Sequence, residues 1–443
     1  MRDTRRRLVI VAPSAYPLGG VQTWLDNVVR GLDATVWSTA VLLPSGVHSD
    51  ASAYLREHAL GEVRLVANAT GSHEGRIRAL MKALRRLEPE IVLCVNIVDA
   101  YDAVVRLRKR GKTALRVAMA LHGLESCYFR DIERYREVMD GVIVTNRLTE
   151  AVVTQICGFP KIRTKYAPCG VDVPAKLPVE STSDVLTLIF AGRLEAQEKR
   201  VMDLPVIANV LKQHKIPLRI RIAGAGPAEE DLRALFDSYK ISVEFLGALD
   251  PKALRANLYH PGAIMLILSP QESGPLVAWE AMANGVAIVT SQFVGIGREG
   301  ALVDGVNCLS FPVGDVQAAA DAVIRMREPT LRRALVASGF ETVKSRYSLE
   351  ASLNAWSRAL ADVLDMSPRE SSVEKLPHPN GRLDLLLGVK LAEAVRRAFG
   401  VSYSHTSAGG EWPHSYGVDD NPEFRRKLTA LDKSSGSLAS SNE

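Results

Sequence analysis

The stretch "AIMLILSPQESGPLVAWEAMANGVAIVTS", residues 263–291, contains the pattern that decides the fold. It begins with a short apolar run (263–269), continues through an alanine-rich segment of helical character and ends with a second apolar run (286–291). Short apolar runs indicate buried strands, and a strand, a helix and a strand in succession indicate a parallel pair joined by a crossover. Glu272 follows the first run, and Glu280 comes eight residues later. Two carboxylates around one helix start favour a ligand over plain core packing.

The same alternation extends along most of the chain. In the first half the apolar runs are 7–13, 90–96, 115–122 and 141–146, and the segments with helical periodicity are 21–32, 73–87 and 100–110. In the second half the apolar runs are 185–192, 218–224, 243–247, 263–269 and 286–291. Strand–helix alternation predicts parallel sheets with helices on both faces. The sequence therefore predicts an α/β fold of two Rossmann-like domains that face each other across a cleft, with a C-terminal extension.

The boundaries of these parts follow from changes in composition. We expect an N-terminal domain over 1–178, a second domain over 179–347 and a closing helix over 348–366. The remainder, 367–443, begins as a polar linker and contains a segment, 381–400, that could form one more helix. The last residues, about forty of them, are rich in Ser, Gly, Asp and Asn, a composition that predicts disorder.

Composition excludes several classes of protein. The chain has 443 residues, 47% of them hydrophobic, and a net charge of +5, which is too weak to indicate a nucleic-acid partner. No apolar run approaches the roughly 20 residues that span a bilayer. The five cysteines form no CxxC pair, so we expect neither a metal site nor a disulfide framework. A reducing cytoplasm is the expected location.

Two features follow the strands predicted in the first half. Gly19 and Gly20 precede a helix after the first strand, where glycines let the backbone approach a phosphate and the helix N-terminus favours an anion. His122 ends the run 115–122, and a histidine at a strand end can bond a sugar hydroxyl. An ordinary strand–helix turn and a loop histidine without a role are the alternatives.

Two further features follow strands of the second half. Arg193 and Lys199 lie six residues apart on the loop after 185–192 and could neutralise a diphosphate, although a solvated charged loop is the alternative. Gly224 and the glycine two residues later do not complete a dinucleotide-binding fingerprint, because Glu229 stands where its third glycine would be.

The helix that follows Glu272 begins with residues suited to an N-terminus. Ser273 or Gly274 can cap it, and Pro275 fits its first turn. The free N–H groups near Gly274, Pro275 and Leu276 would then point into the cleft.

The two glutamates around this helix start should bind neutral groups. A carboxylate beside an anion site repels the anion, so Glu272 is predicted to bond the hydroxyls of a sugar. Glu280 lies more than a turn further on and could reach a ribose diol. A capping glutamate and a solvated helix face are the alternative.

These segments, taken in order, resemble the motifs of one enzyme family. The stretch from Glu272 to Glu280 resembles the E-x7-E motif of the family 4 glycosyltransferases, which have the GT-B fold. The other segments that resemble motifs of this family, in its order, are "GGVQTW" (19–24), "GVD" (170–172), "AGRLEAQEK" (191–199), "IAGAGP" (222–227) and "VDGVNCLSFPVGD" (303–315). The resemblance covers residues 7–365, and 367–443 have no counterpart in it.

The resemblance implies a retaining, hexosyltransferase-type enzyme that uses a nucleotide-diphosphate sugar and needs neither a catalytic metal nor another cofactor. It implies that Arg193 and Lys199 hold the donor diphosphate and stabilise the leaving group. It also implies that Glu272 contacts the transferred sugar and that Glu280 binds the ribose.

In the N-terminal domain the resemblance implies that His122 touches the sugar and the acceptor side. It implies that Gly20 lets the N-terminal loop close on the diphosphate. The implied partners are the nucleotide sugar and a lipid-linked or glycan acceptor, in bacterial polysaccharide, glycolipid or glycoconjugate biosynthesis.

The sequence departs from the family pattern at several positions. Cys169 stands in place of an asparagine, Arg200 and Cys308 in place of glycines, and 273–275 in place of Gly-aromatic-Gly. These departures concern donor specificity and loop geometry. Other functions that the sequence leaves open are a nucleotide-sugar epimerase or hydrolase on the same fold, a nicotinamide dehydrogenase and a non-catalytic binding module.

A basic amphipathic segment raises the question of a membrane. Residues 76–87 place five cations around an apolar face, and 106–112 add five more cations. The hypothesis is weak, salt-sensitive binding of the N-terminal half to anionic lipid, which would make the protein peripheral on the inner face of the membrane. The alternative is a surface helix that buries its apolar face in its own domain.

Overall fold

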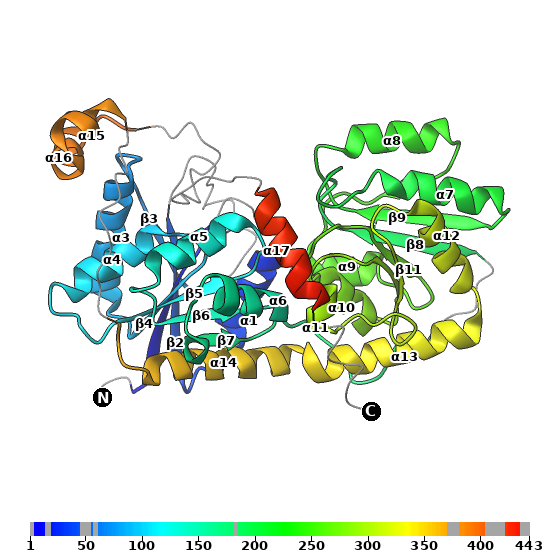
Figure 1. Cartoon of the computed structure of the whole chain (residues 1–443), viewed down its shortest axis with the longest axis horizontal. Helices are drawn as coiled ribbons and strands as arrows, with labels where there is room; N and C mark the ends of the chain where they lie inside the picture. Colours follow the sequence, from blue (N-terminus) through cyan, green and yellow to red (C-terminus); the bar gives the residue numbers. More distant parts are fainter. Residues whose placement is uncertain are drawn as a thin grey trace. The chain divides into compact units, whose positions relative to one another are not determined.

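The computed structural model describes residues 4–13, 19–44, 55, 61–179, 185–369, 381–403 and 421–434. The chain forms two compact units, each with its own sheet (Figure 1). The first unit comprises Met1–Pro168 and Leu353–Arg426, and the second comprises Cys169–Ser352 and Lys427–Glu443. The change of unit at Pro168 comes ten residues before the expected one at 178, and the C-terminal segments are shared between both units.

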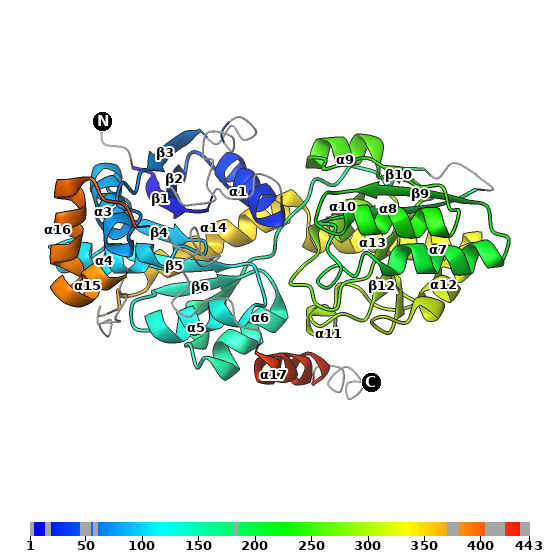
Figure 2. The same cartoon turned by 90° about the horizontal axis from the view of Figure 1, so that it is seen from above.

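The first unit, in its described residues, is built on a seven-stranded parallel sheet with the order β3-β2-β1-β4-β5-β6-β7 (Figures 1 and 2). The strands are β1 (Arg6–Val11), β2 (Trp37–Pro44), β3 (Glu62–Val66), β4 (Ile91–Cys94), β5 (Arg116–Leu121), β6 (Gly141–Val144) and β7 (Thr164–Tyr166). In the middle of this sheet Leu8 lies opposite Thr39 of β2 and Ile91 of β4. The order reverses between β1 and β4, so the topological switch point lies there.

Helices pack around this sheet, and most of them connect its strands. They are α1 (Gly20–Gly31), α3 (His73–Leu87), α4 (Asp99–Arg108), α5 (Ser126–Tyr135), α6 (Arg147–Ala151) and α14 (Leu349–Asp365), with short helical turns at Val152–Ile156 and Lys161–Arg163. Trp24 of α1 packs on Trp356 of α14 with ring centroids 4.7 Å apart, and both residues are buried. From Leu353 onward α14 thus closes the first unit.

The second unit, again in its described residues, has a six-stranded parallel sheet with the order β10-β9-β8-β11-β12-β13. The strands are β8 (Leu186–Ala191), β9 (Leu218–Ala223), β10 (Glu244–Phe245), β11 (Ile264–Ile267), β12 (Ala287–Ser291) and β13 (Leu309–Phe311). The helices are α7 (Asp203–Gln213), α8 (Glu229–Ser238), α9 (Pro251–Asn257), α10 (Leu276–Ala283), α11 (Ile296–Glu299), α12 (Val316–Arg325) and α13 (Pro329–Arg346). Here the strand order reverses between β8 and β11.

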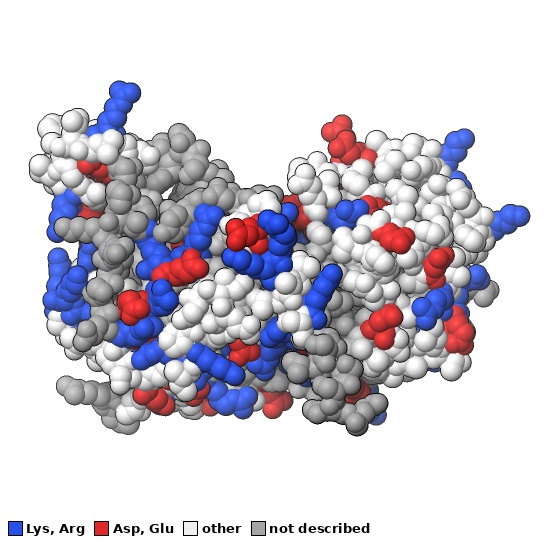
Figure 3. All heavy atoms as spheres, viewed as in Figure 1, with Lys and Arg blue, Asp and Glu red and all other residues white. Residues whose placement is uncertain are grey.

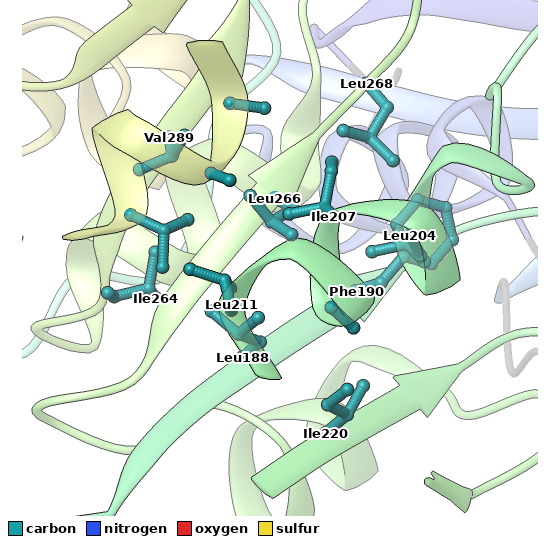
Figure 4. Packing of buried hydrophobic residues seen from close by; sticks show 14 of the residues in the cluster. Leu188, Phe190, Leu204, Ile207, Leu211, Ile220, Ile264, Leu266, Leu268 and Val289 are labelled. Atoms are coloured by element: carbon teal, nitrogen blue, oxygen red, sulfur yellow. The ribbon is translucent and has the colours of Figure 1, made fainter. Parts of the chain in front are cut away.

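The core of the second unit shows why the apolar runs become strands. Parallel strands covered on both faces need apolar side chains at nearly every position. Leu188, Phe190 and Leu266 therefore point from the sheet into a buried cluster, where Leu204 and Ile207 of α7 meet them (Figure 4).

The predicted strands and helices are confirmed where the signal is strong. The helix predicted over 73–87 is α3, and the closing helix is α14. Four strands, β2, β3, β7 and β13, were not predicted from the sequence. The strand β3 has the sequence EVRLV with only Val66 fully buried, and β7 and β13 have three residues each, so no apolar run marks them.

The C-terminal extension has more structure than its composition predicted. The segment 381–400 forms two helices, α15 (Arg382–Leu387) and α16 (Val389–Phe399), because Gly388 between them has a φ of 73°. A further helix, α17 (Pro422–Lys433), lies within the tail that was expected to be disordered, and the division between the units falls inside it. Residues 404–420 and 435–443 lie outside the described residues.

The basic segment in the first unit does not offer its apolar face to a membrane. Ile77, Leu80 and Leu84 of α3 are buried in their own unit. Its Arg76 is also buried and pairs with Asp99 at 3.1 Å. This matches the alternative of an ordinary amphipathic helix.

The second basic segment is likewise tied into the fold. Arg106 pairs with the buried Glu74 at 2.6 Å, and Arg108 pairs with the buried Asp140. Among the described residues no helix is both long enough and apolar enough to cross a bilayer.

Candidate functional site

The switch point of the second sheet gathers most of the predicted site residues. The loop after β8 carries Arg193 and Lys199, and the loop after β11 carries Glu272. These two strands are neighbours, with Ile264 opposite Leu188, so their carboxyl ends meet at one edge. Doubly wound sheets bind ligands at this point.

Lys199 and Glu272 form an ion pair there. The Lys199 Nζ lies 2.5 Å from Glu272 Oε1, and the two side chains are 24% and 14% exposed. The Glu272 N–H donates to the carbonyl of Val294 at 3.1 Å, next to a strand-like bridge between Gln271 and Val294. The backbone that carries the Glu272 carboxylate is therefore fixed by hydrogen bonds. The ion pair joins two residues that are 73 positions apart in the sequence.

Arg193 is also engaged by carboxylates. It donates to Glu195 at 2.7 Å and to Glu198 at 2.8 Å, with 62% of its own side chain exposed. Burial raises the pKa of Glu195, and a hydrogen bond with Glu198 adds to this rise. The site thus holds two cations whose present partners are acidic side chains of the same unit.

The loop that carries Arg193 is supported by a glycine turn. Gly224 has a φ of 149°, and a Cβ placed there would lie 1.8 Å from the carbonyl oxygen of Gly192. A Cβ on Gly226 would lie 2.5 Å from the carbonyl oxygen of Leu194. The turn after β9 therefore requires glycines so that the β8 loop can pack against it.

Glu280 lies in the middle of α10, and its carboxylate contacts another side chain of the second unit. Its Oε2 accepts a hydrogen bond from the buried Tyr259 hydroxyl at 2.9 Å. Burial raises the pKa of Glu280 to about 7, against a lowering by the Tyr259 hydrogen bond. Nearby, Arg255 pairs at 3.1 Å with Asp172 of the predicted "GVD" segment. The carboxyl of Glu280 therefore titrates near neutral pH.

The helix α10 begins later than the sequence predicted. Its first residue is Leu276, and the capping position belongs to Pro275 and not to Ser273 or Gly274. Pro275 adopts an extended conformation, and its carbonyl accepts from Ala278 N–H at 2.8 Å. Gly274 has a φ of 131°, a conformation that explains a glycine directly before the helix.

The remaining predicted residues belong to the first unit. Gly19 precedes α1 at its capping position, as predicted, whereas Gly20 is already the first residue of the helix. Residues 14–18 of the same loop lie outside the described residues.

His122 follows β5 directly and belongs to an aromatic cluster. Its ring centroid lies 4.4 Å from Trp24 and 6.1 Å from Trp356. Burial lowers the pKa of His122 to about 3, so the ring is neutral at physiological pH. It can exchange hydrogen bonds with a neutral ligand but cannot serve as a cation.

One departure from the family pattern, Arg200, falls at a position whose backbone conformation favours glycine. Arg200 has a φ of 48°, a left-handed conformation that favours glycine. Its side chain pairs with Asp203 at 2.8 Å at the start of α7.

The cysteine departures show no reactive character. Cys169 and Cys308 are free thiols, and burial raises the pKa of each to about 12. Neither is suited to act as a nucleophile.

Sequence reasoning missed Asp432 of α17. Its carboxylate accepts from the backbone N–H groups of Gly295 and Arg298, both at 2.8 Å, and Gly297 lies close by. This loop follows Val294, which holds Glu272. No sequence signal marks Asp432, because it lies in a polar segment 160 residues from Glu272.

Comparisons with known proteins agree with this architecture. Residues 186–328 match the model of the family "Glycosyl transferases group 1". The Escherichia coli K12 protein WcaL, assigned to colanic acid biosynthesis as a glycosyltransferase, is 25% identical over 221 residues, which are 46% of this chain and 54% of WcaL. The D-inositol 3-phosphate glycosyltransferase of Acidothermus cellulolyticus is 28% identical over 221 residues, covering 44% of this chain and 47% of that protein. The chain thus spans about half the length of these curated relatives.

Solved structures extend the likeness to both units. Anabaena HepE, whose structure contains UDP and glucose, matches with a TM-score of 0.63 and 15% identity, over 81% of this chain and 100% of HepE. The chain therefore has the GT-B fold, with two Rossmann-like units and a C-terminal helical extension.

Proposed function

We propose that this protein is a retaining glycosyltransferase that transfers a sugar from a nucleotide-diphosphate sugar to an acceptor hydroxyl. The observation that carries the proposal is the Lys199–Glu272 ion pair at the switch point of the second sheet, with the half-buried Glu280 on the adjoining helix. A cation for a diphosphate and a carboxylate for sugar hydroxyls are thereby adjacent. The family match over 186–328 covers all three residues.

The donor diphosphate would be bound by Arg193 and Lys199. Each cation now contacts a carboxylate, so diphosphate binding requires an exchange of partners: Arg193 leaves Glu198, and Lys199 shares its charge between Glu272 and the phosphate. Charge-assisted contacts of this kind also stabilise the leaving nucleotide diphosphate. The residues 274–276 would border the donor from the start of α10.

The sugar and the nucleoside would be bound by carboxylates. Glu272 would accept hydrogen bonds from hydroxyls of the transferred sugar. Glu280 would accept from the ribose diol, which favours the ionised form of this carboxyl. From the first unit, Gly19 and Gly20 would approach the diphosphate, and neutral His122 would exchange a hydrogen bond with the sugar or acceptor.

The retaining course is proposed from the resemblance to the family 4 glycosyltransferases, and no residue among these roles is clearly placed as a covalent nucleophile, so an internal return is preferred to a double displacement. Glu272 is already paired with Lys199 and is assigned to hydroxyl binding. The leaving phosphate would instead assist deprotonation of the acceptor hydroxyl on the same face of the sugar. In this proposal Arg193 and Lys199 carry the charge stabilisation that a divalent metal supplies in other transferases.

The acceptor is proposed to be a lipid-linked or glycan molecule of polysaccharide, glycolipid or glycoconjugate biosynthesis, and the protein is proposed to act in the cytoplasm. WcaL, assigned to colanic acid biosynthesis, supports this class.

A donor screen tests the proposal. UDP-, GDP- and ADP-sugars are compared for thermal stabilisation of the protein and for slow hydrolysis, with Lys199→Ala as the matched control. The configuration at the anomeric carbon of the first product is then determined by NMR. Retained configuration is expected. Epimerised free donor without transfer would favour an epimerase, and binding of none of these donors would refute the proposal.

A further inference from the structure

The C-terminal hairpin, defined as residues 381–403 with α15 and α16, exposes an apolar surface. Six large apolar side chains of the described residues lie exposed on it: Leu385, Leu386, Leu387, Leu391, Phe399 and Val401. Leu386 is 80% exposed and Phe399 is 77% exposed. Contact of so much apolar surface with water is unfavourable. Monomeric proteins rarely leave such a group of side chains uncovered without an interaction partner.

The hairpin is attached to the first unit through its polar side. The buried carboxylate of Glu393 accepts from Thr70 Oγ1 at 2.9 Å and from Ser72 Oγ at 2.6 Å. Tyr403 N–H donates to the Thr70 carbonyl at 2.7 Å. Helix pairs normally pack with their apolar faces inward, so this arrangement leaves the apolar face of the hairpin outward.

The exposed charges of the hairpin are all positive. Its two acidic residues are buried, Asp384 in an ion pair with Arg396 at 2.6 Å and Glu393 against α3. The charged residues that remain exposed are Arg382, Lys390 and Arg397. In Figure 3 the upper left part of the first unit shows mostly white surface, with blue side chains and a little red.

The helix beneath the hairpin adds cations to the same part of the first unit. α16 packs against α3, as both views show (Figures 1 and 2). The exposed cations of α3 are Lys82, Arg85 and Arg86. An exposed apolar surface together with exposed basic side chains on the same unit is the combination that favours binding to the interface of an anionic bilayer.

We propose that the C-terminal hairpin is a peripheral membrane anchor that inserts Leu386, Phe399 and their apolar neighbours among the lipids of an anionic bilayer. The basic side chains then contact the headgroups. A bilayer fits better than a protein partner because no exposed acidic side chain on the hairpin is left to pair with a complementary protein surface.

The anchor lies where it would serve the proposed function. Thr70 and Ser72 belong to the loop after the carboxyl end of β3, and the carboxyl edge of such a sheet is its ligand-binding edge. The anchor would hold this edge near lipid and so near a lipid-linked acceptor. This consequence rests on the proposed function, whereas lipid binding itself does not.

Vesicle flotation of the full chain tests the anchor. Vesicles of phosphatidylcholine with phosphatidylglycerol are compared with vesicles of phosphatidylcholine alone, at low and high salt. We expect the wild type to float with the anionic vesicles and to do so less at high salt. The double variant Leu386→Glu/Phe399→Glu should bind at least about tenfold more weakly, because two large apolar side chains no longer enter the lipid.

The matched control is Ile162→Glu, which charges a side chain of the same unit that is 71% exposed and lies outside the hairpin. It should float like the wild type, and thermal melting should show that all variants are folded. A wild type that stays soluble at low salt, or a double variant that floats equally well, overturns the anchor. Self-association in sedimentation velocity that is lost in the double variant, without flotation, would also overturn it and assign the surface to a second copy. Donor binding is measured in parallel, so that failure of the anchor and failure of the proposed function are distinguished.

Discussion

Glu272 Oε1 and Lys199 Nζ are 2.5 Å apart, so the carboxylate proposed for the sugar and the cation proposed for the diphosphate neutralise each other before any donor binds. A donor must therefore redistribute this pair. Glu272 is the residue whose loss should separate binding from chemistry, because its removal frees the lysine for phosphate while it deprives the sugar of its acceptor.

We expect Glu272→Ala to reduce sugar transfer by on the order of 100-fold to 1,000-fold, the scale typical for loss of one preorganised transition-state contact. Affinity for the free nucleotide diphosphate should be kept or increased, because Lys199 loses its competing partner. Calorimetry and initial rates check both statements. The control is Glu230→Ala on the exposed side of α8. Unchanged turnover would remove Glu272 from the site.

The Arg193 contacts predict opposite effects for two substitutions. Arg193→Ala should weaken nucleotide-diphosphate binding, and Glu198→Gln should strengthen it by releasing the arginine from its 2.8 Å ion pair. Both residues are more than half exposed, so we expect changes of about threefold to tenfold, in line with about 1 kcal/mol for an exposed pair. Titrations at low and high salt test this, because screening should shrink both effects. Weaker binding by Glu198→Gln would contradict the exchange of partners.

Lys199→Ala should also weaken diphosphate binding and lower turnover. It removes one charge-assisted contact, which is worth about 1.5–3 kcal/mol. It also leaves Glu272 without its cation, so the loss should exceed that of Arg193→Ala. Turnover measured with and without EDTA accompanies this experiment, since strong inhibition of the wild type by EDTA would argue against cations acting in place of a metal.

The sequence predicted the fold well because the central strands of both sheets are buried on both faces. Their runs, such as 263–269, are apolar at nearly every position, and the helix periods between them are clear. The edge strands β3, β7 and β13 lack that signal, since an edge strand with one exposed side tolerates polar residues. The polar segment with α17 was misjudged for a related reason, because a few contacts hold it, among them the buried Leu428 and Asp432, and composition does not reveal such contacts.

Residue types at strand ends predicted the candidate site, but not its pairings. That Arg193, Lys199 and Glu272 share one sheet edge follows from the strand order, which places β8 beside β11. The contact between Glu280 and Tyr259 could not be predicted, because it depends on how α10 packs against the segment after α9. The sequence predicted a ribose contact for Glu280 but not the raised pKa of about 7 that desolvation gives its carboxyl.

Glu280 should make both stability and binding depend on pH. Its pKa is raised from 4.5 to about 7, so the folded state binds a proton that the unfolded state has released between these values. Stability is therefore lost as pH rises from about 4.5 to about 7 and is constant above that range, with an upper bound of about 3 kcal/mol. Glu280→Gln should remove this loss. Urea unfolding of the wild type and of Glu280→Gln at pH 5 and pH 8 measures this loss. If the unfolding free energies of the two proteins differ by the same amount at both pH values, the prediction is contradicted.

Nucleotide binding tests the same carboxyl from the ligand side. If the ribose diol donates to ionised Glu280, affinity should rise with pH through about 7 in the wild type and should lack that rise in Glu280→Gln. Titration of the nucleotide phosphate is common to both proteins, so their difference reports Glu280 alone. A variant with the affinity and pH profile of the wild type would exclude Glu280 from the nucleoside site.

Asp432 should control the order of the loop that supports Glu272. Its buried carboxylate accepts two backbone N–H groups at 2.8 Å, from Gly295 and Arg298, directly after Val294, whose carbonyl accepts from Glu272 N–H at 3.1 Å. Asp432→Ala leaves these donors without an acceptor, which costs about 1–3 kcal/mol of local stability. We expect faster amide hydrogen exchange at 295–298 and reduced turnover, with a smaller change in nucleotide affinity. Asp231→Ala, an exposed acid on α8, is the control. Unchanged exchange at 295–298 in Asp432→Ala would show that the loop keeps its order without α17.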